Sequence, residues 1–361
     1  MTTIPRKPSA IQRVSELSEY DYDLPKDLIA QVPLRQRATT RLMLVDRHRQ
    51  EIEHRHVRDL PEILRAGDCL VVNNTKVVPA RLLGHRSETS GRWEGLFLEA
   101  DQRGNWRLLC KTRGKLGPGE AITLDERDGN ATVELRLVMK EPGGVWVARP
   151  QSDESTWTLL DRFGHVPLPC YIRRGASNPA DCQRYQTVYA QVPGSAAAPT
   201  AGLHFTPELL ERLEHEGVTR ANVTLHVGLD TFRPIAVESL AEHEMHSEFG
   251  TIDEATVAQL ATCRAAGHRI VAVGTTSVRV LETAAAEGAL TAWSGHTRLF
   301  IRPPYEFRGV DALLTNFHLP RSTLLVLVRT FGGDALIRRA YDEAIEQQYR
   351  FYSYGDAMLI I

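Results

Sequence analysis

A glycine followed by three hydroxyl residues stands where an expected strand passes into an expected helix. The segment GTTSVR at 274–279 follows an apolar run at 269–273 and precedes a helical pattern. Free backbone N–H groups at such a junction, together with the positive end of the helix dipole, favour a negatively charged ligand. Arg279 falls within the first two turns and can clamp a carboxylate through two parallel hydrogen bonds. The alternative is an ordinary turn in which Thr or Ser caps the helix.

A second junction of the same kind lies at 315–324, with the sequence TNFHLPRSTL. The expected strand over 312–317 ends in polar residues that include Asn316, and His318 follows it. Ser322 or Thr323 is predicted to cap a helix that runs through residue 328. Two polar junctions after strands indicate one ligand site at the carboxyl ends of those strands.

His204 follows a run of small residues, APTAGL at 198–203, which includes Thr200 and Gly202. Small residues permit a close approach of the backbone to a ligand, and a histidine transfers protons near neutral pH. These features favour an acid/base role for His204 and a binding role for the turn. A histidine hydrogen-bonded to backbone beneath a turn is the alternative interpretation.

Three further histidines lie near acidic or polar residues. His226 is expected on a strand over 223–227, and the segment EHEMHSE at 242–248 contains His243, His246 and Glu248. His243 and His246 have the i, i+3 spacing of a metal pair on a helix, but the motif H-E-x-x-H is absent. We therefore expect no metal there. The segment is either a solvated loop or an acid/base patch that faces the substrate.

Polar residues also gather in two other segments. Asn73 and Asn74 lie between expected strands, and Tyr354 and Asp356 lie in an aromatic segment at the chain end. Aromatic faces can stack on a purine. The alternatives are a simple turn for the asparagines and core packing for the aromatic residues.

Two patterns of strand and helix signals along the chain indicate the elements that position these residues. Strand and helix signals alternate from about 155 to 361, which is typical of an α/β domain. Short strands separated by turn signals fill 67–150, which predicts an antiparallel barrel or sandwich. We therefore predict an α/β catalytic domain over 1–66 and 151–361, and a separate β-domain over 67–150.

Composition limits the classes of partner. The net charge is −2, so a nucleic acid would be contacted by local basic patches and not by an overall positive field. Five scattered cysteines without a C-x-x-C pair suit a reducing compartment. The first ten residues lack the apolar core of a signal peptide, and no apolar run is long enough to cross a bilayer. We expect a cytoplasmic protein that does not contact a membrane.

Taken together, the motifs resemble those of the S-adenosylmethionine:tRNA ribosyltransferase-isomerase family of the queuosine pathway. The matching stretches follow the order of the family and cover nearly the whole chain: YDLP at 22–25, LIAQ at 28–31, NNTKV at 73–77, PLPCYI at 167–172, YQTVY at 185–189, APTAGLHF at 198–205, TLHVG at 224–228, MHSE at 245–248, GTTSVR at 274–279, TNFHLPRSTL at 315–324 and YRFYSYGDAM at 349–358. Three departures are Asp230 in place of a glycine, Cys170 in place of a proline and Lys76 in place of an arginine.

The resemblance implies a fold and a reaction. It implies an α/β domain joined to an antiparallel β-barrel domain, with no metal and no true cofactor. S-adenosylmethionine would be a consumed substrate whose ribosyl group is transferred and isomerised onto 7-aminomethyl-7-deazaguanine at the tRNA wobble position. The products would be epoxyqueuosine-tRNA, adenine and methionine. We expect a monomer whose partners are S-adenosylmethionine and tRNA carrying that base.

The chemistry needs a base beside the sulfonium, an acid for adenine and a polar site for an alkoxide. We assign His204, His246, Glu248 and His318 to the catalytic set. The predicted substrate-binding residues are Asn73, Asn74, Thr200, Gly202, His226, Thr275, Thr276, Ser277, Arg279, Asn316, Tyr354 and Asp356. Two other functions stay open: a relative that acts on a small deazapurine or nucleoside, and a non-catalytic tRNA- or nucleotide-binding protein.

Overall fold

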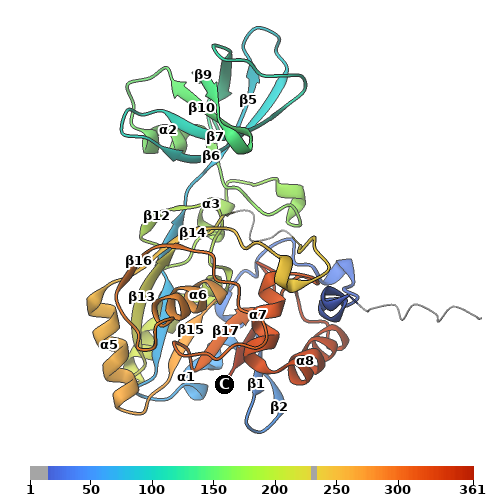
Figure 1. Ribbon diagram of the computed structural model, residues 1–361, viewed down its shortest axis with the longest axis vertical. Helices are drawn as coiled ribbons and strands as arrows, with labels where there is room; N and C mark the ends of the chain where they lie inside the picture. The colour runs from blue at the N-terminus through green and yellow to red at the C-terminus, as the bar shows by residue number, and fades with distance from the viewer. Residues whose placement is uncertain (1–14, 229–233) are drawn as a thin grey trace, which may run out of the picture.

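A computed structural model describes residues 15–228 and 234–361, which form a large mixed sheet flanked by helices and a separate barrel (Figure 1). Asp230 and the first ten residues, which entered the sequence interpretation, lie outside the described residues. The α/β domain with an antiparallel β-barrel domain, as expected from the sequence, is confirmed.

The large sheet contains nine strands. Their order across the sheet is β16 (Trp293–Thr297), β14 (Glu248–Ile252), β13 (Thr219–Leu225), β3 (Cys69–Asn73), β15 (Ile270–Val273), β17 (Ala312–Asn316), β18 (Ala357–Ile360), β1 (Arg41–Asp46) and β2 (Glu51–His56). Strands β13, β3, β15 and β17 run parallel to one another. Their carboxyl ends therefore meet at one edge of the sheet.

The central strands are apolar because both faces of the sheet are covered. In β3, Cys69 and Val71 pack into one core cluster, while Leu70 and Val72 pack into the cluster on the opposite face. A strand buried on both faces gains from apolar residues at every position, which explains the continuous apolar runs in the sequence. This rigid sheet fixes where the polar strand ends lie.

Helices cover both faces of the sheet. The helices that supply the first core cluster are α5 (Glu254–Ala265), α6 (Thr275–Ala284), α7 (Thr323–Gly332) and α8 (Asp334–Glu346). The opposite face is covered by α1 (Leu60–Ile63) and α4 (Pro207–His215). Helix α4 starts with a threonine cap followed by a proline: the Thr206 hydroxyl accepts a hydrogen bond from the Leu209 N–H.

The second domain is a closed antiparallel barrel. Its strands are β5 (Arg81–Arg86), β6 (Arg92–Ala100), β7 (Trp106–Thr112), β10 (Val145–Pro150), β9 (Thr132–Lys140) and β8 (Ala121–Asp125), and β8 pairs with β5 to close the ring. Closure removes the exposed sheet edges that a sandwich would leave. The short strand β11 (Gly164–His165) adds to β5, and β4 (Thr75–Val77) pairs with β12 (Val192–Ser195) next to the large sheet.

The domain boundaries differ from those predicted at 67 and 150. Strand β3 lies in the middle of the large sheet, so the barrel begins at β5. On the other side, α2 (Thr156–Phe163) buries Leu159, Leu160 and Phe163 in the barrel core. Local strand signals are the same for a buried parallel strand and a barrel strand, which is why the sequence pattern placed β3 in the wrong domain.

Candidate functional site

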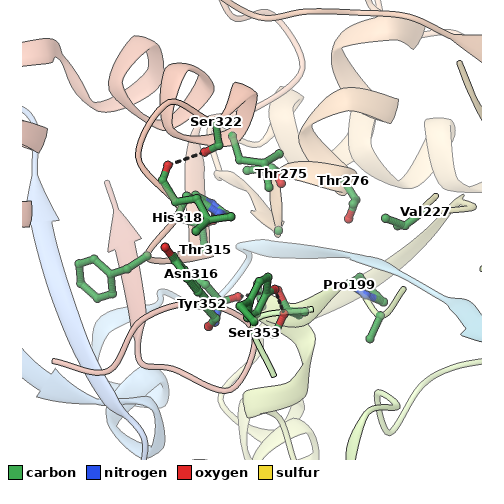
Figure 2. Close-up of a pocket in the computed structure, with 18 residues that line it drawn as sticks. Pro199, Val227, Thr275, Thr276, Thr315, Asn316, His318, Ser322, Tyr352 and Ser353 are labelled. Atoms are coloured by element: carbon green, nitrogen blue, oxygen red, sulfur yellow. Dashed lines mark hydrogen bonds between the residues drawn. The ribbon is translucent and has the colours of Figure 1, made fainter. Parts of the chain in front are cut away.

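A cavity opens at the carboxyl ends of β15 and β17, where α6 and α7 begin (Figure 2). About 620 Å³ of space free of protein atoms lies in the cavity and in the open solvent at its mouth. Its lining residues come from six separate segments: Tyr171, Ala198, Pro199, Thr200, Ala201, Val227, Gly274, Thr275, Thr276, Thr315, Asn316, Phe317, His318, Leu319, Ser322, Leu324, Tyr352 and Ser353. We call this cavity the first pocket.

The N-terminus of α6 forms one wall of the first pocket. Gly274 precedes the helix with a φ of 88°, a conformation that glycine adopts without strain, and no side chain caps the helix. The sequence alternative of a Thr or Ser cap is therefore wrong. The first-turn N–H groups of a helix lack intrahelical partners. In addition, the Thr276 hydroxyl is buried and has no hydrogen-bond partner among the described residues.

The N-terminus of α7 lies at the same pocket. The Ser322 hydroxyl caps this helix by accepting from the Leu325 N–H at 3.2 Å, as the sequence predicted, and it donates to the Leu319 carbonyl (Figure 2). No lysine, arginine, aspartate or glutamate is among the described lining residues. The positive potential of the first pocket therefore comes from two helix ends, which suits an anionic group.

His318 points into the first pocket from the end of β17 (Figure 2). Its Nε2 lies 2.9 Å from the Thr315 hydroxyl, and its backbone N–H donates to the Tyr341 hydroxyl. Within the described chain its Nδ1 makes no hydrogen bond, so that atom is available to a ligand. Burial lowers the pKa of His318 to about 3, so the ring is neutral at pH 7.

His204 lies behind this wall and is linked to it by a hydrogen bond. The Asn316 side-chain amide donates to Nε2 of His204 at 3.1 Å, and its oxygen accepts from the Thr200 hydroxyl at 3.0 Å. Burial, together with the nearby Arg37 and Arg350, lowers the pKa of His204 to about 3. His204 itself lines a smaller neighbouring cavity with Tyr354.

The aromatic wall of the first pocket differs from the one expected. Tyr352 and Tyr171 line the pocket with ring centroids 4.8 Å apart. Tyr354 is buried elsewhere and donates to Asp181, while the Asp356 carboxylate accepts from backbone N–H groups of two neighbouring segments. Tyr354 and Asp356 do not line the first pocket, because local packing already uses their polar groups, and their contact with a ligand stays a prediction.

Two residues of the opening motif face away from the pocket. The Ser277 hydroxyl is fully buried and donates to the Val273 carbonyl, four residues earlier. Arg279 forms an ion pair with Glu248, and both side chains are almost fully buried. Burial lowers the pKa of Arg279 to about 10. The guanidinium is thus committed within the protein and does not clamp a carboxylate in the first pocket.

The remaining polar residues form a second pocket beside the first. His226, His246 and Glu248 line it, and Val227 lines both pockets. His226 directly follows β13, which ends at Leu225, so it is not within the strand as expected. His243 and His246 are not in a helix. In the described part of the chain, no group of three or more potential ligand residues could hold a metal ion.

Three predicted binding residues serve the fold. The Asn73 side chain bonds to both the N–H and the carbonyl of Leu225, and Asn74 accepts from the Thr224 hydroxyl. A Cβ on Gly202 would lie 1.9 Å from the Tyr189 hydroxyl oxygen. The close approach at Gly202 is thus to a protein side chain and not to a ligand.

Pattern reasoning missed several lining residues: Tyr171, Pro199, Val227, Thr315, Ser322, Tyr352 and Ser353. All of them belong to segments that the motifs had identified, so the sequence indicated the correct segments but not these residues within them. Tyr352 adopts a φ of 72°, which redirects the chain end and brings residues 352 and 353 to the pocket in place of 354 and 356. A left-handed residue other than glycine leaves no mark in the sequence.

Comparisons with known proteins place these features in context. A family model described as queuosine biosynthesis protein matches residues 17–360. Two proteins named S-adenosylmethionine:tRNA ribosyltransferase-isomerase are similar to the chain: that of Symbiobacterium thermophilum is 51% identical over 96% of this chain and 99% of the relative, and that of Moorella thermoacetica is 48% identical over the same shares. The crystal structure of S-adenosylmethionine tRNA ribosyltransferase from Thermotoga maritima is 38% identical, covers 95% of this chain and 100% of that one, and has a TM-score of 0.54. No described helix is long and apolar enough to cross a membrane.

Proposed function

The chain belongs to the queuosine biosynthesis protein family, a family of enzymes, and from that premise we propose the reaction that it catalyses. It transfers and isomerises the ribosyl group of S-adenosylmethionine onto 7-aminomethyl-7-deazaguanine at the tRNA wobble position. The products are epoxyqueuosine-tRNA, adenine and methionine. S-adenosylmethionine is consumed, and the reaction uses no metal and no separate cofactor.

The observation that carries the proposal is the convergence of two helix N-termini on the first pocket, next to the buried Thr276 hydroxyl, which has no hydrogen-bond partner in the described chain. The N-terminus of α6 and the Thr276 hydroxyl suit the carboxylate of the methionine portion. The aromatic side chains of Tyr171 and Tyr352 suit the flat adenine. The absence of charged side chains among the described lining residues leaves the sulfonium without a competing cation.

The neutral state of the two histidines defines what they contribute. His318 presents a neutral ring with one unprotonated nitrogen at pH 7 and is the candidate acceptor for the proton beside the sulfonium. His204 holds Asn316 in place by accepting its amide hydrogen, so it acts as a positioning residue. Neither histidine carries a spare proton at pH 7, so adenine takes its proton from another donor.

The direct test incubates the protein with S-adenosylmethionine and tRNA that carries the aminomethyl-deazaguanine, and detects adenine by chromatography. Adenine and methionine should form in equal amounts with the modified tRNA only. Matched reactions contain tRNA with guanine at the same position, or the free deazaguanine base. Binding of S-adenosylmethionine without any adenine release would contradict the proposal and favour the non-catalytic binding protein.

Two outcomes separate the enzymatic alternatives. Equal turnover of the free base and of the modified tRNA would favour a relative that acts on a small deazapurine. A steep loss of turnover with added salt supports tRNA, because phosphate contacts release counterions on binding. A salt-independent rate on tRNA would argue against an extended RNA contact.

A further inference from the structure

The second pocket lies between the two domains and shares one wall with the first. Its barrel side is apolar and includes Phe97 and Leu98 of β6. The other side comes from the segment after β13 and from the start of β14. Val227 lines both pockets, and its backbone is held by the Ser195 hydroxyl, which accepts from the Val227 N–H at 2.7 Å. A ligand in each pocket would meet the other at Val227.

The two pockets have opposite chemical character. The first offers helix N-termini and hydroxyl groups, whereas the second offers His226 and His246 beside an apolar surface, and the Glu248 carboxylate there is held in its ion pair with Arg279. No lysine or arginine is among the described residues that line the second pocket. It therefore suits a flat ligand that carries hydrogen-bond donors, and it does not suit a phosphate.

Hydrogen bonds define the tautomer of His226. The Thr75 hydroxyl donates its single hydrogen to the Ser195 hydroxyl oxygen at 2.9 Å, so it can only accept from the histidine. Nδ1 of His226 lies 2.8 Å from the Thr75 oxygen and must carry the ring hydrogen. Nε2 is then the unprotonated nitrogen, and it has no hydrogen-bond partner among the described residues. Burial lowers the pKa of His226, which also favours the neutral ring.

Gly194 and Phe249 both lie close to the His226 ring. A Cβ on Gly194 would lie 2.7 Å from the ring, so the backbone of Gly194 covers one face. The Phe249 ring lies at 20° to the His226 ring with centroids 6.1 Å apart. Phe249 is 39% exposed although it is a large apolar residue, so part of its surface is free for contact with a flat ligand.

We propose that the second pocket receives the aminomethyl-deazaguanine base, and that Nε2 of His226 removes a proton from the ammonium group of that base. This inference rests on the proposed function. One N–H bond of the ammonium breaks, an Nε2–H bond forms, and the electron pair stays on the amine nitrogen. The neutral amine then carries the electron pair that transfer of the ribosyl group to it requires, and His226 releases its proton to solvent.

The test uses single-turnover rates with modified tRNA as a function of pH. His226→Gln should lower the rate about 100-fold at pH 7, which is typical of a lost general base. The rate of the variant should then rise about tenfold per pH unit between pH 7 and 9, because the free amine fraction rises by that factor below its pKa. The wild type should depend less steeply on pH. His215→Gln, on the exposed surface at the end of α4, is the matched control.

Affinity for S-adenosylmethionine separates this inference from a folding defect. His226→Gln and Phe249→Ala should bind S-adenosylmethionine within about twofold of the wild type, because the first pocket is intact. Phe249→Ala should raise the KM for modified tRNA at least tenfold, and Val138→Ala, a matched exposed apolar residue on the barrel, should not. Wild-type activity with unchanged kinetics in both variants would overturn the inference and leave the proposed function intact. If the wild type releases no adenine, the proposed function itself fails.

Discussion

The side-chain amide of Asn316 donates a hydrogen bond to Nε2 of His204 across 3.1 Å, in a fully protein-enclosed contact. Asn316 lines the first pocket, whereas His204 does not. The bond requires that Nε2 of His204 be unprotonated, so it couples the protonation state of a buried histidine to the position of a pocket residue.

This coupling predicts non-additive effects on catalysis. His204→Ala and Asn316→Ala should each reduce adenine release, and the double variant should lose much less than the sum of the two losses. Interaction energies between residues in one hydrogen-bond network are about 0.5–3 kcal/mol. The double-mutant cycle is obtained by measuring kcat/KM for the wild type, the two single variants and the double variant. If the losses in kcat/KM of the two single variants simply add in the double variant, the hydrogen bond between His204 and Asn316 has no effect on the first pocket.

The two buried histidines His204 and His318 predict a stability loss in mild acid. Their pKa values are lowered to about 3 in the folded state, so the unfolded chain binds more protons below pH 6.5. Stability is therefore complete above about pH 6.5 and falls as the pH approaches 3, by roughly 1.4 kcal/mol per pH unit for each histidine.

Urea unfolding at pH 7, 6 and 5 measures this dependence. His204→Gln and His318→Asn should each flatten the slope by about one proton, whatever their effect at pH 7. His215→Gln, which replaces an exposed histidine, should leave the slope unchanged. A wild-type slope retained in both pocket variants would contradict the neutral state of these histidines.

The ion pair of Arg279 and Glu248 predicts a structural effect. Both side chains are at most 4% exposed, so removal of one partner leaves a buried charge without compensation. Arg279→Met should lower the free energy of unfolding by about 3–5 kcal/mol. Arg58→Ala breaks a pair whose arginine is 59% exposed and should cost less than about 1 kcal/mol. If both variants lose less than about 1 kcal/mol of unfolding free energy, the ion pair of Arg279 and Glu248 does not stabilise the fold.

Thr276 predicts an effect on binding alone. Thr276→Val replaces by a methyl group a buried hydroxyl that bonds to none of the described residues, so folding should change little. The dissociation constant for S-adenosylmethionine should rise about 10-fold, as expected for the loss of a hydrogen bond to a charged group. Calorimetry gives the value, and Thr262→Val on the exposed face of α5 is the control. Unchanged affinity would place the carboxylate elsewhere.

Gly202 predicts a steric effect that a second substitution relieves. Gly202→Ala would place a Cβ 1.9 Å from the Tyr189 hydroxyl oxygen and should destabilise the protein by about 1–3 kcal/mol. Tyr189→Phe removes that oxygen, so the double variant should regain part of the loss. Gly117→Ala meets no atom within 4 Å and serves as the control. Thermal unfolding measures the stability of each variant. A Gly202→Ala variant as stable as the wild type would show that the backbone shifts to accommodate the added Cβ.

Much of the first pocket follows from local sequence. Thr275, Thr276, Asn316 and His318 were predicted because they lie at or shortly after the ends of buried strands, and parallel strands bring their carboxyl ends to one edge. The cap at Ser322 was predicted for the same local reason. These features depend on residues close in the chain, where spacing and residue type suffice.

The partners of buried polar groups were beyond such reasoning. Arg279 was expected to bind a substrate carboxylate, but its partner is Glu248, 31 residues away in the chain. Asp356 was expected at a base, but its carboxylate is used by backbone N–H groups from two segments. A buried charge takes whichever compensating group the fold brings near, and residue type alone does not specify that group.

The sequence by itself determined the strands, most helix starts, the two-domain architecture and the polar strand ends, because periodicity and capping are local properties. Only the tertiary structure decided the domain boundary at β3, the division of the polar residues between two pockets and the tautomer of His226. Those outcomes depend on contacts such as the one between Thr75 and His226, 151 residues apart, which form only when the sheet is assembled.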